Sequence, residues 1–258
     1  MKIYHKISKL MPEGQTKNKI RNLVYGLLNS VSWGSKEVIL DKDRRIKGKF
    51  SNLLLIKHSD CINELQGYVK NYLPKEGDVV IDAGSFYGIF AIYAAKLVGK
   101  KGKVICFEPE ETNFKLLKKN IKINKLKNVI LIKKGLWNKE TILKFKCHGA
   151  DSRLAFFDKE EELCNQVKVT NLDKIYKDLS LQKIDFVKMD IEGAEIQAIE
   201  GAREIMKEKN IHFAIASYHV VNGEKTCIKL EQMFKKIGYS AKTEYPEHLT
   251  TYAHKKSK

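Results

Sequence analysis

Two acidic residues, each at the end of a short apolar run, are well suited by type and spacing to bind a nucleoside. Asp82 ends the first run and is followed by Gly84 and Gly88, and Glu108 ends the second run. This order is typical of a βαβ unit that binds a nucleoside or nucleotide. The turn reads Asp-x-Gly-x-x-x-Gly and lacks the central glycine at which a backbone approaches a pyrophosphate. The pattern therefore favours a nucleoside without phosphates, and S-adenosylmethionine fits that description.

Each residue of this motif has an expected role. We expect the Asp82 carboxylate to lie near the methionine ammonium of the cofactor, directly or through water, although an acid here can also serve only the turn. Gly84 would let the backbone bend beside the ribose, and Gly88 would let the next helix pack close to the strand. Glu108 can accept hydrogen bonds from both ribose hydroxyls. Pro109 would stop the strand and fix the turn.

A second group of candidate residues follows the fourth and fifth predicted strands. Asp190 and Glu192 are two apart in an extended segment, so their side chains can face one crevice. His219 follows the fifth strand and, like either acid, could take a proton from an acceptor hydroxyl. Acids here can also serve the N-terminus of the next helix, which suits Glu195 best. A hard-metal site is conceivable but not expected, because no further acid follows the fifth strand.

Two other segments can complete the crevice. In the turn after the third predicted strand, a backbone amide at Gly135 or Leu136 could read the adenine edge. Trp137, next to them, could cover the adenine, but a place in the core is the preferred interpretation. An inserted loop contains Ser152 and Arg153, which we expect on the acceptor side.

The positions of these residues depend on an alternation of strands and helices that begins near Asp78. The alternation predicts a doubly wound, Rossmann-like sheet, mostly parallel, with its ligand at the carboxyl ends of the strands beside the first strand. A closing hairpin in 239–252 would add an antiparallel C-terminal strand. The predicted strands are 79–82, 104–107, 129–132, 184–189 and 211–216, the predicted helices are 89–98, 112–123, 194–206 and a helix through 227–237, and extra β segments are expected at 142–145 and 167–170.

Residues 1–74 form an N-terminal extension in this interpretation, and residues 75–258 form the cofactor-binding domain. Turn chemistry at 74–78 marks the start of the domain. The extension is expected to contain two short amphipathic helices and a possible hairpin. The helices would span 3–10 and 20–28, and the hairpin would pair 38–40 with 50–56.

Composition limits the classes of protein that remain. The 258 residues carry a formal net charge of +17, which could indicate a nucleic-acid or anionic-membrane partner. Only five arginines are present and the lysines are spread along the chain, so a solvated surface is the preferred interpretation. No stretch is apolar enough to span a bilayer, no secretory signal is recognised, and the five cysteines show no C-x-x-C spacing. These features predict a cytoplasmic protein with free thiols, although peripheral membrane contact stays open.

Three blocks of this sequence together resemble the FkbM-type methyltransferases. They are the Val-Ile-Asp-x-Gly-x-x-x-Gly turn, Phe107-Glu108-Pro109 with the helix after it, and the stretch from Lys188 to Glu195. Leu172-Asp173 is also similar, and the resemblance covers about residues 77–220. The family often has Ala-Asn after the first glycine, whereas this chain has Ser85-Phe86, so the contacts of Ser85 stay open.

The resemblance implies a class I enzyme that uses S-adenosylmethionine and mainly methylates hydroxyl oxygens on sugars, polyketides and other natural products. It makes Asp82, Gly84, Gly88 and Glu108 cofactor residues. It also makes Asp190 and Glu192, which follow the fourth strand, residues of the active site.

Alternatives to this interpretation remain. The net charge suggests an RNA methyltransferase, but arginine is scarce and the Asn/Asp-Pro-Pro-aromatic motif used for planar amino groups is absent. A nicotinamide-dependent oxidoreductase on the same sheet lacks its Gly-x-Gly-x-x-Gly turn. No feature of the sequence excludes a binding module without catalysis. The expected partner is a small-molecule or glycan hydroxyl.

Overall fold

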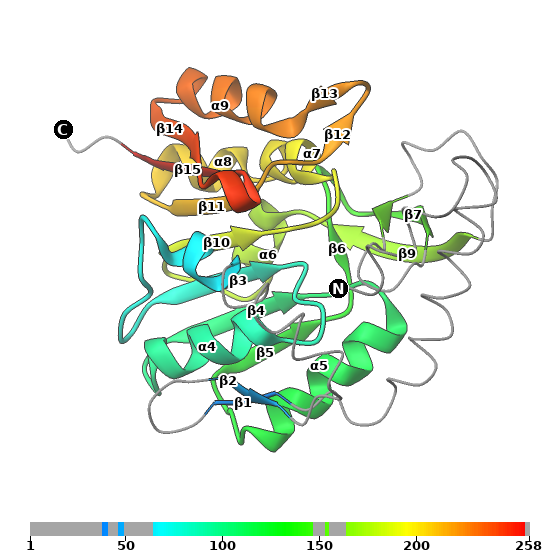
Figure 1. The fold of residues 1–258 in the computed structure, drawn as a ribbon, viewed down its shortest axis with the longest axis vertical. Coiled ribbons are helices and arrows are strands. Elements are labelled where there is room, and N and C mark those ends of the chain that lie inside the picture. The colour runs from blue at the N-terminus through cyan, green and yellow to red at the C-terminus, as the bar shows by residue number, and fades with distance from the viewer. Residues whose placement is uncertain (1–37, 41–45, 49–63, 147–152, 155–163, 256–258) are drawn as a thin grey trace, which may run out of the picture.

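The computed structural model describes residues 38–40, 46–48, 64–146, 153–154 and 164–255. A seven-stranded sheet in the order β14-β15-β11-β10-β3-β4-β5 forms the centre of this part of the chain (Figure 1). Its parallel strands are β3 (Val79–Ala83), β4 (Lys103–Phe107), β5 (Val129–Ile132), β10 (Phe186–Met189) and β11 (His212–Ala216). The hairpin of β14 (Tyr239–Glu244) and β15 (Thr250–Lys255) pairs antiparallel with β11. The predicted sheet, including its antiparallel C-terminal strand, is confirmed.

The order of the strands reverses beside β3. The chain runs from β3 outward through β4 to β5, and it then returns to the other side of β3 as β10 and continues to β11. In a doubly wound sheet this reversal opens a crevice at the carboxyl ends of the strands. Asp82 lies in β3, Glu108 follows β4, and Asp190 follows β10. The topology therefore brings the predicted residues to the edge where a ligand is expected.

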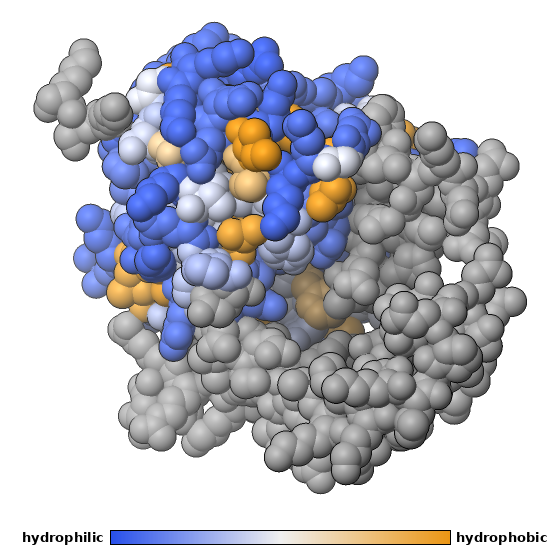
Figure 2. Space-filling view, turned by 45° about the horizontal axis from the view of Figure 1, so that its top comes forward, coloured by the Kyte–Doolittle hydropathy of each residue, from blue (hydrophilic) through white to orange (hydrophobic). Residues whose placement is uncertain are grey.

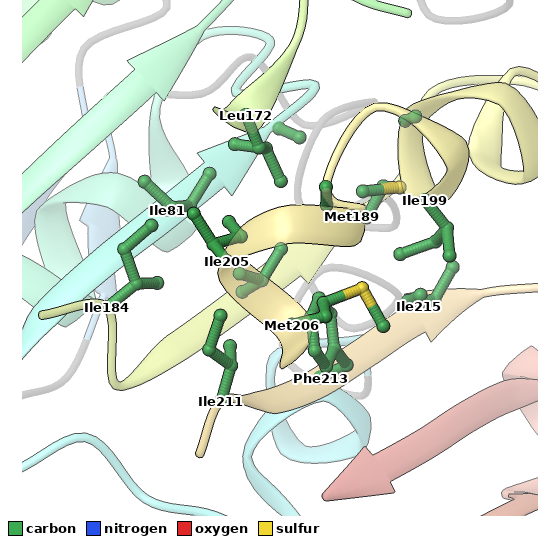
Figure 3. Close-up of a cluster of buried hydrophobic side chains, with 14 of the residues drawn as sticks. Ile81, Leu172, Ile184, Met189, Ile199, Ile205, Met206, Ile211, Phe213 and Ile215 are labelled. Carbon is green, nitrogen blue, oxygen red and sulfur yellow. The ribbon is translucent and has the colours of Figure 1, made fainter. Parts of the chain in front are cut away.

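Helices cover both faces of the sheet because successive strand residues are mostly apolar and point alternately to opposite faces. On one face, α4 (Ile89–Val98) and α5 (Glu111–Ile123) pack against the cluster that contains Val80 and Val104. On the other face, Ile81 and Phe213 lie in a second cluster with residues of the remaining helices (Figure 3). Those helices are α6 (Leu172–Asp178), α7 (Glu195–Glu200), α8 (Arg203–Glu208) and α9 (Thr226–Lys236).

The single helix predicted at 194–206 is wrong, because the chain forms α7 and α8 there with a break at Gly201. The Asp173 carboxylate, on α6, accepts hydrogen bonds from the backbone amides of Glu204 and Ile205 at 3.1 and 2.9 Å. These amides belong to the first turn of α8, where an acceptor from outside can satisfy them. A Cβ atom at Gly201 would also collide with the carbonyl oxygen of Trp137. An external cap and a close backbone approach thus interrupt the helix.

A smaller four-stranded sheet in the order β6-β9-β7-β8 lies beside the main one and confirms the predicted extra β segments. The segment predicted as a turn around Gly135 and Leu136 is instead a short strand of this sheet. Its carbonyls and amides pair with those of a longer strand, parallel to it. The four strands are β6 (Gly135–Leu136), β7 (Thr141–Lys146), β8 (Arg153–Leu154) and β9 (Cys164–Thr170).

The N-terminal extension is described in part. β1 (Val38–Leu40) pairs antiparallel with β2 (Ile46–Gly48), which precedes the strand predicted at 50–56. That strand and the helices predicted at 3–10 and 20–28 lie outside the described residues. Residues 64–69 are helical, and Leu65 and Tyr68 are buried in the same hydrophobic cluster as α4.

The outer surface is mainly hydrophilic on the face shown in Figure 2, with scattered hydrophobic side chains among the described residues. Among the described residues, lysines supply the positive charge of many exposed ion pairs, for example Lys174 with Asp178 at 2.9 Å and Lys235 with Glu231 at 2.7 Å. Among the helices that the structure describes, none has the length and hydrophobicity needed to cross a membrane.

Candidate active site

The turn after β3 is held against the end of β10 by a close backbone contact. Gly84 has a φ of +74°, and a Cβ atom there would overlap the carbonyl oxygen of Asp190. Gly88 has a φ of +95°, precedes α4, and leaves room for the side chain of Leu117 on α5. Both glycines are thus required by backbone conformation and by space. They bring the turn, α5 and Asp190 together.

Asp82 is completely buried and forms an ion pair that the sequence did not reveal. Its Oδ1 atom lies 3.2 Å from the Nζ atom of Lys188, which lies directly beside it on β10. The ammonium of Lys188 also donates to the carbonyl oxygen of Gly84 at 2.8 Å. Burial alone would lower the pKa of Lys188, but Asp82 and then Asp190 outweigh it and raise the pKa. The predicted contact of Asp82 with the cofactor ammonium stays a prediction.

Ser85 also has a structural partner. Its hydroxyl donates to the backbone carbonyl of Asp82 at 2.8 Å, and the residue is 4% exposed. Its backbone amide and that of Gly84 both donate to the carbonyl of Phe107 at 3.0 Å. Ser85 therefore closes the turn from inside, and the turn is tied to the end of β4.

Glu108 lies where a ribose-binding carboxylate is expected, between the turn after β3 and the start of α5. Its Oε2 atom accepts the backbone amide of Phe86 at 2.8 Å, and its Oε1 atom accepts that of Glu110 at 3.0 Å. Burial raises the pKa of Glu108 to about 7, although these two backbone hydrogen bonds lower it. The neighbouring Pro109 ring lies beside Gly135, so the ends of β4 and β6 meet here. The ribose contact itself stays a prediction.

Gly135 and Leu136 form β6, and the side chain of Leu136 is in the core at 2% exposed. Trp137 is 6% exposed and packs with Val169, which agrees with the preferred core interpretation. An adenine contact by the β6 backbone stays a prediction. Ser152 lies outside the described residues, and Arg153 begins β8.

Asp190, Glu192 and His219 converge, as their positions after β10 and β11 predict. The Nε2 atom of His219 lies 3.6 Å from Asp190 Oδ1 and 3.3 Å from Glu192 Oε2. One oxygen or nitrogen of each residue lies within 4.8 Å of the others. Glu192 has a φ of +55°, a conformation that costs energy for a residue other than glycine. The strained backbone of Glu192 thus coincides with a side chain that contacts His219.

The sequence interpretation missed the role of Glu195 in this cluster. Its carboxylate is completely buried, and its Oε1 atom lies 3.1 Å from the Nδ1 atom of His219. The same oxygen accepts the backbone amides of Ile191 and Gly193 at 3.1 and 3.2 Å. Glu195 thus does serve the turn before α7, but it also contacts the imidazole on the side away from Glu192.

Protonation of this cluster follows from its charges. Burial alone would lower the pKa of His219, but Glu192, Glu195 and Asp190 outweigh it and raise the pKa to about 11. Burial raises the pKa of Glu192, although His219 lowers it. At neutral pH the histidine of the metal-free protein is therefore an imidazolium among three carboxyl groups, and a carboxylate is better suited than this histidine to accept a proton.

Aromatic residues from distant parts of the chain surround Asp190. The hydroxyl of Tyr68 donates to Asp190 Oδ2 at 2.9 Å and lies 3.4 Å from the His248 Nε2 atom. Burial, and then the charge of Asp190, raise the pKa of Tyr68 well above its usual value, so this hydroxyl stays protonated. The Tyr218 ring, 37% exposed, packs against the rings of His219 and His248. These three residues, Tyr68, Tyr218 and His248, are the candidate acceptor side of the site.

Comparison with known proteins decides the family. A family model described as the methyltransferase FkbM domain matches residues 82–242, which is more than half of the chain. The chain belongs to the FkbM methyltransferase family. A crystal structure of methyltransferase FkbM from Methylobacillus flagellatus KT has a TM-score of 0.53 at 19% identity, covering 78% of this chain and 52% of that one. This likeness shows the shared class I methyltransferase fold, and fold and family together support S-adenosylmethionine as the cofactor.

Two curated relatives of this FkbM-family chain are named for two different substrates, a ribosomal protein and tRNA. One is a ribosomal protein L11 methyltransferase of Syntrophomonas wolfei, 32% identical over 101 residues, or 39% of this chain and 30% of the relative. The other is a tRNA (adenine-N(1))-methyltransferase, TrmI, of Methanocaldococcus jannaschii, 26% identical over 67% of this chain and 61% of the relative. The chain thus spans less than two thirds of either relative, and their substrates do not identify its own.

In this FkbM-family chain, the residues that the sequence interpretation missed all contact partners that are distant in the sequence. Tyr68 and His248 lie far along the chain from Asp190, and Lys188 gains its role from the adjacent strand β3. Only the Lys188 position carried a local signal, since a lysine inside an apolar strand needs a buried partner. The tertiary arrangement alone shows the other contacts.

Proposed function

We propose that this protein transfers the methyl group of S-adenosylmethionine to a hydroxyl oxygen of a sugar, glycolipid or other small natural product. The observation that carries the proposal is the contact between two halves of one crevice. The turn at Gly84 and the Glu108 carboxylate form the donor side, and Gly84 touches the backbone of Asp190. Asp190 and Glu192 then belong to the side where an acceptor hydroxyl would lie.

The chemistry needs alignment first and proton removal second. The methyl carbon of a sulfonium is already electrophilic, so the protein has mainly to hold the acceptor oxygen, this carbon and the sulfur in line. A neutral hydroxyl must also lose its proton. Because His219 already holds a proton, Asp190 or Glu192 is the better acceptor, and the raised pKa of Glu192 suits this task.

The acceptor side suits a ligand with both hydroxyl groups and an apolar face. Tyr218 offers a partly exposed ring next to polar groups, and such side chains contact ligands through the ring while the hydroxyl group reaches water. His248 adds a half-buried imidazole at the same place, next to the buried hydroxyl of Tyr68. A sugar ring has this combination of surfaces.

RNA is the second acceptor class, because the formal net charge is +17 and one curated relative is named as a tRNA methyltransferase. Binding to phosphates would weaken steeply with added salt. The small number of arginines makes the glycan or lipid acceptor the favoured one.

The test is to incubate the protein with methyl-labelled S-adenosylmethionine and separate fractions of glycans, lipids and RNA. We expect label in a glycan or lipid fraction, in a bond that resists alkali as an ether does. D190N should lower the rate at least about 100-fold and change the affinity for S-adenosylhomocysteine less than about threefold. E204Q, at an exposed carboxylate on α8, is the matched control and should retain full activity. Label confined to RNA, or a D190N variant as active as the wild type, would refute the proposal.

A further inference from the structure

The cluster of Asp190, Glu192 and His219 offers one nitrogen and two oxygens to a common point. The Nε2 atom of His219 lies 3.3 Å from Glu192 Oε2 and 3.6 Å from Asp190 Oδ1. Bonds of about 2.1 Å between a divalent metal and its ligands place neighbouring ligand atoms about 3 Å apart in an octahedron. The two distances from His219 exceed this value by about 0.3 and 0.6 Å, and all three atoms lie within 4.8 Å of one another, so side-chain rotations that draw the carboxylates inward would close the site.

Two of these atoms are buried without a hydrogen bond that satisfies them. They are Asp190 Oδ1 and His219 Nε2, and the His219 side chain is 9% exposed. Without a cation these atoms are held by ion pairing and not by aligned hydrogen bonds, and ion pairs of poor geometry offset only part of the desolvation cost. Both atoms face the point that the three residues share. A ligand that accepts electron pairs from both would remove this cost.

The outer contacts orient the same two atoms. Glu195 lies 3.1 Å from His219 Nδ1, which leaves Nε2 to face the cluster. Tyr68 donates to Asp190 Oδ2, which leaves Oδ1 to face it. A histidine that binds a metal typically donates its other ring N–H to a carboxylate, and metal-bound carboxylates are hydrogen-bonded as well. Glu195 is the carboxylate beside the outer nitrogen of His219, and Tyr68 is the hydrogen-bond donor to the Asp190 carboxylate.

We propose that Asp190, Glu192 and His219 bind a divalent first-row transition-metal cation such as Mn²⁺. One imidazole and two carboxylates suit this class better than Mg²⁺ or Ca²⁺, which favour oxygen alone, or a structural zinc site rich in thiolates. Water and an acceptor oxygen complete the coordination of the cation.

The role of the cation in catalysis rests on the proposed function. A hydroxyl oxygen bound to it loses its proton more readily, and that proton passes to the free carboxylate oxygen of Glu192. The oxygen then forms a bond with the methyl carbon, and the bond between carbon and sulfur breaks with its electron pair on sulfur. The products are the methyl ether and S-adenosylhomocysteine.

The test is titration of the metal-free protein with Mn²⁺. Binding is measured as the loss of the electron paramagnetic resonance signal of free Mn²⁺. We expect one bound ion per chain. H219A and D190N should each weaken binding at least tenfold, and Y68F, which changes an outer contact, should weaken it up to about tenfold. H254A is the matched control, because His254 is an exposed histidine on β15, and it should bind Mn²⁺ as the wild type does.

Affinity for S-adenosylhomocysteine and thermal unfolding are measured on every variant, so loss of metal binding is separated from loss of the fold. Wild-type protein that binds S-adenosylhomocysteine but no Mn²⁺, Co²⁺ or Zn²⁺ up to millimolar concentration would overturn the cation site and leave the proposed function standing. Binding that persists in both H219A and D190N would place the ion elsewhere and would equally overturn the site. A protein that binds the ion at these residues but methylates no hydroxyl would support the site and contradict the proposed function.

Discussion

The ribose assignment of Glu108 predicts a pH-dependent affinity for the cofactor. The carboxylate is 5% exposed, and its pKa of about 7 means that it becomes ionised only near neutral pH. The ionised form offers acceptor lone pairs on both oxygens to the two ribose hydroxyls, whereas protonation turns one oxygen into a donor and weakens this binding. At pH 5.5, about 1.5 pH units below this pKa, ~3% of Glu108 is ionised, so the affinity should be weaker than at pH 8 by up to about 30-fold.

The assay is calorimetric titration of the wild type and E108Q with S-adenosylhomocysteine between pH 5.5 and 8. The wild-type affinity should increase by up to about tenfold per pH unit below pH 7 and then level off. E108Q should bind weakly and with little dependence on pH, because glutamine has the same shape but does not ionise. A flat wild-type profile, or an E108Q variant with the same slope, would refute the role of this carboxylate in cofactor binding.

Thermal or chemical unfolding gives a second measurement on the same pair. An acid whose pKa is higher in the folded state binds more protons when folded, so stability falls as pH rises between the two pKa values. For Glu108 this window runs from 4.5 to about 7, and the full loss is about 3 kcal/mol. E108Q should therefore gain stability relative to the wild type as pH rises from 5 to 8. No relative gain would mean that the buried carboxyl group does not carry the raised pKa.

Two further substitutions test the framework of the crevice. K188M leaves the buried Asp82 carboxylate without its partner and should lower the free energy of unfolding by about 3–5 kcal/mol, measured by urea denaturation; equal stability would show that the ion pair is dispensable. G84A places a Cβ atom on the Asp190 carbonyl at a φ of +74°, whereas G223A has a similar φ of +84° with open space around it. G84A should therefore destabilise the protein by at least ~1 kcal/mol more than G223A, and equal effects would argue against a close backbone contact.

The sequence predicted the sheet well because its strands are short and apolar on both faces. The run at Val79, for example, is continuous and bounded by turn residues, so β3 appears within one residue of the predicted end. The helix through 194–206 was wrong for a reason outside its own sequence. Asp173, on another helix, caps the start of α8, and helical periodicity carries no information about such a partner.

The candidate site was predicted where its residues follow strand ends. Asp190, Glu192 and His219 come together because the carboxyl ends of parallel strands lie at one edge of the sheet. Glu195 and Tyr68 could not be placed in the same way. The angle at which α7 leaves its turn decides where Glu195 points, and the packing of 64–69 decides where Tyr68 lies. Such tertiary packing leaves no periodic pattern of hydrophobic residues from which these contacts could be predicted.

The position of the segment that contains Tyr68 has a consequence for how acceptor preference could change. Tyr68 of this segment contacts Asp190, and the neighbouring Gly67 accepts a hydrogen bond from Tyr252 of β15, so the candidate acceptor side depends on both this segment and the C-terminal hairpin. The residues predicted to hold the cofactor lie in other turns, after β3 and β4. Under the proposed function, we expect that grafting residues 64–69 together with this hairpin from one relative to another exchanges what is methylated while the source of the methyl group stays the same.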